Sequence, residues 1–260
     1  MTEITIFGFL AGLLLLALPL YVMFKFRLRI MDIVFASFVR MVVMMGVVGG
    51  ILYFVLRYNT LWLNVLCMVT MSLAGAVYAV RRSRLSLRRF FYPVAAGMVS
   101  ATLIIGLYIL FLVTGAASPL AANLSLPVAG VLVGAMVTCN AKALHTYYSG
   151  LENHHQLYDY LIGNGATHGQ AVNYFVRRAL EANMVPQARV MAYVMLRASP
   201  AMMWGMLIGG AELWQALAVN VVLTVAAMAA SVVSLVVSLI IARKYCFDDY
   251  QSLKADIKQP

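Results

Sequence analysis

Four histidines, side chains that often bind transition metals, fall within one short segment of the chain. They are His145, His154, His155 and His168. No two of them are four residues apart, so no pair is placed on one helix face as paired metal ligands would be, and no cysteine lies nearby. The pattern favours an interface role for this segment over a metal site, and the ligands of any metal stay unknown.

The other reactive side chains do not form a recognisable enzyme site. The chain has no GxxxxGK[ST] phosphate-binding loop and no readable nucleophile–base arrangement. Cys67, Cys139 and Cys246 are far apart in sequence, so a disulfide framework is not expected. Methionine thioethers suit Cu(I), but methionine in apolar segments is usually packing material. We expect a non-catalytic chain with no cofactor of its own.

Long apolar segments make up most of the chain and must position the side chains considered above. Of the 260 residues, 63% are hydrophobic and 11% charged, whereas soluble chains carry about a quarter charged residues. Four stretches contain no Asp, Glu, Lys or Arg: 4–24, 58–80, 90–141 and 213–242. About 20 apolar residues cross a bilayer as a helix, so the third stretch has room for two crossings. The sequence therefore predicts an all-α, polytopic membrane protein.

Basic residues indicate how many times the chain crosses the membrane. The net charge is +10, and the basic residues gather at 25–29, 81–89, 142–189 and from 243 to the end. Such residues favour the cytoplasmic side, which explains the charge without nucleic acid. All four groups share that side if the chain has seven spans, about 4–24, 33–56, 60–80, 92–114, 125–143, 188–210 and 215–241.

This topology predicts a multi-pass protein of the cell (inner) membrane, with the N-terminus outside and the C-terminus in the cytoplasm. Residues 1–260 then form a single transmembrane domain. Glu3 precedes the first run and basic residues follow it, the reverse of a signal peptide, so we expect 4–24 to be a retained span. The sixth span contains Arg189, Arg197 and Pro200, and we expect it to be kinked or partly unwound.

Few ionisable groups fall inside the spans. No Asp or Glu lies deep within any of them, which disfavours a carrier driven by protons or sodium. Arg40 could line a pathway or extend toward the headgroups. Our candidates for a transport pathway are Arg40, Asn140, Arg189 and Asn220. Rows of small residues, such as Gly130–Gly134–Thr138 and Ala226–Ala230–Ser234–Ser238, predict close helix packing, either within the chain or between two copies.

One polar helix interrupts the apolar sequence, in a cytoplasmic segment over 144–186. Thr167 and Gln170 have the spacing of a capping box, and Ala171, Phe175 and Ala179 form an apolar row after it. Arg177 and Glu181 are in i,i+4 register, Pro186 is expected to end the helix, and Leu151 to Ile162 is a candidate second helix. Such a helix can lie on the membrane or dock into a partner, and the glycine turn at 163–165 favours docking.

Several motifs together resemble the permease subunit of the FetB-type iron-export ABC transporters, a seven-span family with plant relatives linked to aluminium tolerance. The resemblance covers about 30–245. It rests on Val39-Arg40, LPVAGVLVG at 126–134, GATHGQA at 165–171, RRALEANMVP ending at Pro186 and SPAMMWGMLIGG at 199–210. The chain departs from the family at several polar positions in the membrane, for example Ala135 in place of an asparagine and Met44 in place of a glutamine.

The resemblance implies a homodimeric permease that exports metal ions such as iron and is driven by a separate cytoplasmic ATPase holding ATP and Mg. It also implies ATPase coupling by the loop and helix after residue 163. The coupling residues are then Gly165, Ala166, Thr167, Gln170 and Ala171, and we add Phe175 and Arg178 of the following helix as expected coupling contacts. Two other functions stay open: a secondary carrier without an ATPase, and a non-transporting scaffold or sensor that uses the histidine-rich segment.

Overall fold

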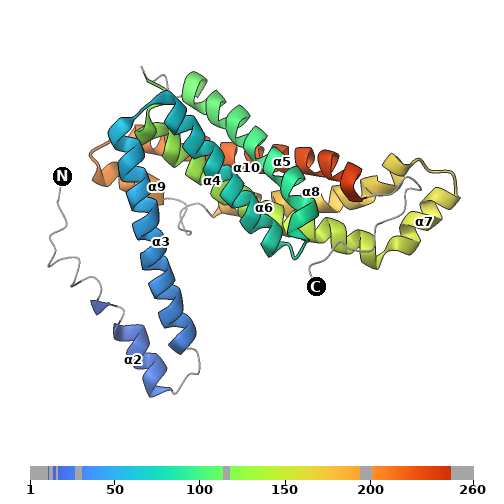
Figure 1. The fold of residues 1–260 in the computed structure, drawn as a ribbon, viewed down its shortest axis with the longest axis horizontal. Helices are drawn as coiled ribbons and strands as arrows, with labels where there is room; N and C mark the ends of the chain where they lie inside the picture. Colours follow the sequence, from blue (N-terminus) through green and yellow to red (C-terminus); the bar gives the residue numbers. More distant parts are fainter. Residues whose placement is uncertain are drawn as a thin grey trace. The chain divides into compact units, whose positions relative to one another are not determined.

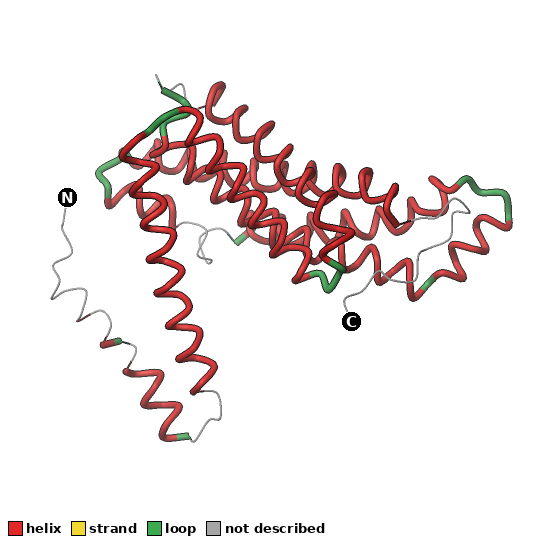
Figure 2. Tube along the Cα trace, in the orientation of Figure 1, coloured by secondary structure: helices red, strands yellow, loops and turns green. Residues whose placement is uncertain are grey.

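In the computed structural model, every regular element among the described residues is a helix (Figure 2). The structure describes residues 11, 14–15, 17–26, 31–113, 118–193 and 201–246. These residues fall into two compact units, the first made of those up to 58 with 208–210 and the second of the others, from 59 to 207 and from 211 to 246.

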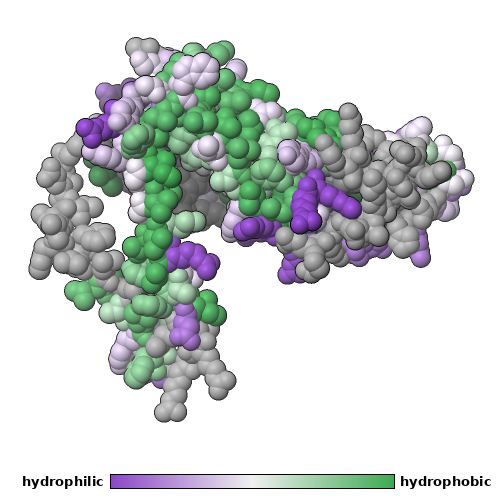
Figure 3. All heavy atoms as spheres, in the orientation of Figure 1, coloured by the Kyte–Doolittle hydropathy of each residue, from purple (hydrophilic) through white to green (hydrophobic). Residues whose placement is uncertain are grey.

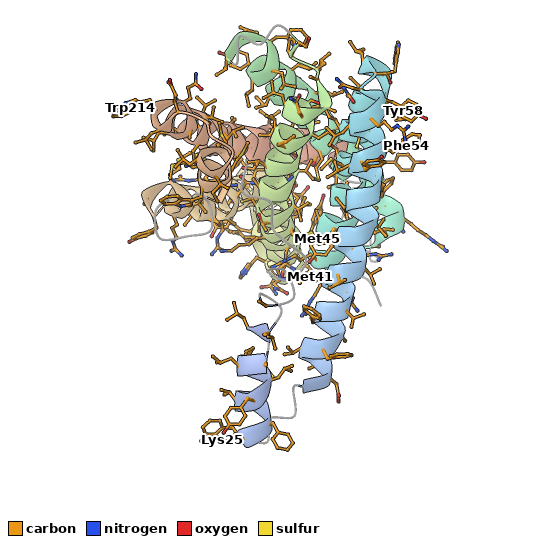
Figure 4. The ribbon with its side chains drawn as sticks, turned by 90° about the vertical axis from the view of Figure 1, so that its left-hand side faces the viewer. Lys25, Met41, Met45, Phe54, Tyr58 and Trp214 are labelled. Atoms are coloured by element: carbon orange, nitrogen blue, oxygen red, sulfur yellow. The ribbon has the colours of Figure 1, made fainter. Side chains whose placement is uncertain are left out.

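The first unit contains α2 (Ala17–Lys25) and α3 (Met31–Tyr58), which contact each other. Figure 4 shows side chains projecting around α3, with Met41 and Met45 one turn apart. Near its end, the rings of Phe54 and Tyr58 lie 4.6 Å apart between centroids (Figure 4). α3 is apolar along most of its length, as expected for a membrane span.

The second unit is a bundle of long helices with a helical extension at one end (Figure 1). Its elements are α4 (Leu61–Arg82), α5 (Leu87–Tyr108) with the π-helical turn η1 (Ile109–Val113), α6 (Ala122–Asn153), α7 (His155–Gly163), α8 (His168–Ala192), α9 (Ala201–Ile208) and α10 (Leu213–Cys246). α5 packs along α10, α4 packs against α5 and α6, and α8 packs against α6 and α10. In the space-filling view, hydrophobic residues cover the visible helices and hydrophilic ones gather near the α4–α5 turn (Figure 3).

Small residues allow α5 and α10 to approach closely. A Cβ atom built on Gly97 would lie 2.5 Å from the backbone oxygen of Ser234. Ala230, Ser234 and Ser238 are buried, so this row of small residues packs within the chain. Gly134 and Thr138 on α6 are exposed instead, which leaves the second predicted row open on the described surface.

Five described helices are long and apolar enough to cross a membrane. They are Asp32–Tyr58, Leu61–Arg82, Leu87–Val113, Ala122–Asn153 and Leu213–Ala242. They confirm apolar helices at the second, third, fourth, fifth and seventh predicted spans. Residues 4–10, 12–13 and 16 of the first predicted span lie outside the described residues, so the count of seven stays a prediction.

Two boundaries predicted from the sequence are wrong. The first was the end of the polar helix, because Pro186 lies inside α8, which continues to Ala192. The second was the sixth span, 188–210: its start belongs to α8, and α9 ends at Ile208 before a turn at Gly209–Gly210. Residues 194–200, with Arg197 and Pro200, lie outside the described part. Within the segment 144–186, α6 continues to Asn153, the candidate helix over Leu151 to Ile162 corresponds to α7, and the polar helix after Thr167 is α8.

Candidate functional site

The turn between α7 and α8 is fixed by local hydrogen bonds. Gly165 has φ +86, and its N–H donates to the carbonyl of Ile162, while the N–H of Ala166 donates to that of Leu161. This pair of bonds is a Schellman motif, whose left-handed position suits glycine. Thr167 then caps α8: its Oγ1 accepts from the N–H of Gln170, and the Gln170 side chain accepts from the N–H of Thr167. The predicted capping box is confirmed.

One face of α8 holds this extension to α6. Ala171 and Phe175 are buried, and the Phe175 ring lies so near Gly150 that a Cβ there would be 3.2 Å from it. The Phe175 side chain is thus a contact within the chain and is not on the surface. Of the predicted coupling residues, Phe175 and Ala171 therefore position the helix, and only the others can contact a partner at the surface.

The opposite face of α8 is exposed and basic. Arg178 is exposed and lies over the Tyr174 ring, 5.7 Å from its centroid. Arg177 forms the predicted ion pair with Glu181 at 3.3 Å, and both side chains are well exposed. Gly165, Thr167 and Gln170 are also exposed, so the turn and the first part of α8 present polar groups at the surface.

Farther along α8, a buried network of amides and hydroxyls joins three helices. Asn183 donates to Oδ1 of Asn140 on α6 at 3.0 Å and to the carbonyl of Ser231 on α10 at 3.3 Å. The Ser231 hydroxyl donates back to Oδ1 of Asn183 at 2.9 Å, and Asn140 donates to the Ser234 hydroxyl at 2.7 Å. All four residues are fully buried. Each amide is therefore satisfied, and the network fixes α8 in register against α6 and α10.

Beyond this network, α6, α8, α9 and α10 enclose a cleft of about 990 Å³. Its polar lining residues are Thr138, Cys139, Lys142, Gln187, Asn220 and Thr224, and the other lining residues are apolar, glycine or proline. Pro186, Gln187 and Val190 bring the last turns of α8 to its wall. A single helix thus runs from the exposed turn at Thr167 to this cleft.

Three of the four predicted pathway residues belong to the second unit, where they lie in different surroundings. Asn220 lines the cleft, whereas Asn140 lies behind its wall in the buried network. Arg189 is exposed on α8, and Arg40 is exposed on α3 in the first unit.

Lys142, Asn183 and Gln187 were not predicted from the sequence. The signal for the last two was the four-residue spacing Phe175–Ala179–Asn183–Gln187, which continues the apolar row. All four residues are buried, so this row is the face by which α8 packs on the bundle.

The described residues contain no group of three or more His, Cys, Asp or Glu side chains that could hold a metal ion. Nδ1 of His145 lies 3.2 Å from the carbonyl oxygen of Ser83 in the α4–α5 turn, so this histidine joins two segments of the chain. Cys67 and Cys139 are both buried and free, as expected.

The apolar helices and their buried packing define a multi-pass helical membrane protein. Residues 6–247 match a family described as "Uncharacterised protein family (UPF0014)", and the chain belongs to this family. It is 21% identical over 227 residues to the UPF0014 membrane protein YjkA of Bacillus subtilis strain 168, covering 86% of this chain and 87% of that one. It is 24% identical over 229 residues to the protein Aluminum sensitive 3 of Arabidopsis thaliana, covering 88% and 82%. No solved structure matches the chain.

Proposed function

We propose that the chain is the permease subunit of an ABC transporter, driven by a separate cytoplasmic ATPase. The observation that carries this proposal is the continuity of α8, whose 25 residues extend over about 37 Å at 1.5 Å per residue. One end is the exposed, capped turn at Thr167, and the other forms a wall of the cleft. A force applied to the turn would therefore reach the cleft without crossing a flexible joint.

The partner would contact the exposed surface formed by the turn and Arg178. The Schellman motif and capping box satisfy the backbone groups of the turn, so the surface is preorganised for docking. The arginine guanidinium held over Tyr174 suits an acidic or carbonyl-rich pocket. Buried Phe175 would transmit the load to α6 through its contact with Gly150.

The proposal includes a homodimer in the cell membrane and outward transport of a metal ion such as iron, both from the family resemblance. The plant relative's name, Aluminum sensitive 3, supports a link to metals for that protein. Because the described residues hold no cluster of metal ligands, the test includes several metals.

Co-purification of the full chain with its candidate ATPase tests the coupling surface. The informative variant is Arg178→Glu, which reverses the charge of an exposed residue without opening the core. Arg57→Glu is the matched control, because Arg57 lies in the last turn of α3, on the side that the predicted topology places outside the cell. We expect Arg178→Glu to weaken the complex about tenfold or more, the size of a lost interface arginine, and to abolish metal-stimulated ATPase activity in lipid. Equal complex formation by the two variants would refute docking at this surface.

A further inference from the structure

The cleft beside α8 has one charged lining residue, and it is a lysine. Among its fourteen lining residues, Lys142 is the only one with a charge, and no carboxylate lies among them. No described Asp or Glu forms an ion pair with the Lys142 ammonium. The remaining polar groups are neutral amides, hydroxyls and a thiol. A bare metal cation would therefore be repelled here, whereas an anion would be attracted.

Lys142 lies at one end of the apolar wall. It is 20 residues after Ala122, the first residue of α6, and thus about 30 Å along the helix, close to the thickness of the hydrocarbon core. One turn later, His145 contacts the carbonyl of Ser83, which places Lys142 near the basic α4–α5 turn. Basic residues mark the cytoplasmic face, so the ammonium lies at the level of that leaflet's headgroups.

From Lys142, the cleft continues along α6 past Gly134 to Val131, toward the middle of the membrane. Gly134 presents no side chain, and no atom lies within 4 Å of where its Cβ would be. Leu223 and Ala227 of α10 form the facing apolar wall. The site is thus amphipathic: it is cationic at the headgroup end and apolar in depth. Its volume, about 990 Å³, is at the upper end of the roughly 300–1,000 Å³ of small-molecule sites.

We propose that this cleft binds one anionic phospholipid of the cytoplasmic leaflet, with its phosphate at Lys142 and an acyl chain along Gly134 and Leu223. The charge pattern favours a lipid over a second copy of the chain, because a twofold contact would bring two cationic clefts together. The bound lipid would be a resident ligand of the chain. Its binding goes beyond the proposed transporter and holds whether or not an ATPase pairs with the chain.

The full chain, purified in a mild detergent, is titrated with phosphatidylglycerol and with phosphatidylcholine, and bound lipid is counted by native mass spectrometry. We expect one phosphatidylglycerol to bind in preference to phosphatidylcholine. Lys142→Gln should weaken its binding about fivefold, the contribution of one basic residue near an anionic headgroup, and Lys142→Arg should retain it. Arg88→Gln, which removes a basic residue of the same end outside the cleft, is the control and should have no effect.

A second variant tests the acyl part of the site. Gly134→Leu should weaken phosphatidylglycerol binding about tenfold, as expected if roughly two methylene groups are displaced. Gly46→Leu adds the same side chain to α3, where a Cβ also meets no atom within 4 Å, and should leave binding unchanged. Circular dichroism and monodisperse elution show that each variant is folded.

Three results would overturn the proposal. Equal binding of the two lipids, or binding unaffected by Lys142→Gln, would remove the role of the charge. Displacement of phosphatidylglycerol by inorganic phosphate alone at comparable concentration would show an anion site that needs no acyl chain. Conversion of a dimer to a monomer by Gly134→Leu, with lipid binding unchanged, would assign this face to a second copy. None of these measurements involves the ATPase, so they fail or succeed independently of the proposed function.

Discussion

Asn183 joins α8 to both α6 and α10 by hydrogen bonds, and replacing it with alanine should destabilise the protein by about 3 kcal/mol. The substitution removes the bonds to Asn140 at 3.0 Å and to the Ser231 carbonyl at 3.3 Å, and the bond from the Ser231 hydroxyl at 2.9 Å. Side-chain hydrogen bonds between membrane helices average about 0.6 kcal/mol each, so three contribute about 2 kcal/mol. Oδ1 of Asn140 is then left buried without a partner, which adds about 1 kcal/mol or more.

The assay is reversible unfolding of the full chain in mixed micelles of dodecyl maltoside and SDS, followed by circular dichroism. Asn173→Ala is the matched control, because Asn173 is the same residue type on the same helix but is exposed. A double-mutant cycle with Asn140→Ala should show coupling, since both substitutions remove the same 3.0 Å bond. If Asn183→Ala and Asn173→Ala unfold within about 0.5 kcal/mol of each other, a difference expected of unrelated surface sites, the network does not hold α8.

Two further substitutions test the ends and the packing of the bundle. Thr167→Ala should cost about 1 kcal/mol of local helix stability. It should also speed hydrogen exchange at the Gln170 amide about fivefold, because that amide donates to the hydroxyl that is lost. Thr167→Ser should exchange like the native chain, and unchanged exchange in Thr167→Ala would show that the cap is not needed. Gly97→Ala should destabilise the protein by about 1–3 kcal/mol, because the new Cβ would lie 2.5 Å from the Ser234 backbone oxygen. Gly134→Ala meets open space and should be near neutral in the same thermal unfolding measurement, so equal melting temperatures for the two alanine variants would contradict the close approach of α5 and α10.

The features that could be predicted from the sequence depend on local chemistry or on composition. Charge-free runs predicted four of the five apolar helices, because a bilayer core excludes charge over a defined length. The capping box at Thr167 and the Arg177–Glu181 pair were predictable because both involve residues three or four apart. The cleft was not predictable, because its lining comes from four helices that are distant in sequence. Asn220 was identified, but Lys142 was counted only as one of the basic residues of a loop.

Pro186 shows why the polar helix was assigned too short a length. In a soluble helix, an interior proline removes a hydrogen bond and usually marks an end. Here α5 and α6 also contain interior prolines, Pro93 and Pro127, so these helices accommodate the lost bond through their neighbours. For α8 the neighbouring helices are α6 and α10, and Asn183, one turn before Pro186, is hydrogen-bonded to both of them. The helix therefore continues because its tertiary contacts outweigh the local preference.

The continuity of α8 changes how coupling would work in a transporter of this kind. If α8 ended at Pro186, the exposed turn would be a separate lever joined to the membrane part by a flexible link. With α8 continuous, Thr167 and Gln187 belong to one rigid element, and the buried Asn183 lies between them as a fixed point. Because α8 also packs on the bundle through Phe175 and Ala179, a push on the turn would move the helix and the cleft wall together. Weakening the network by Asn183→Ala should therefore reduce coupling more than it reduces docking, which co-purification and ATPase activity measure separately.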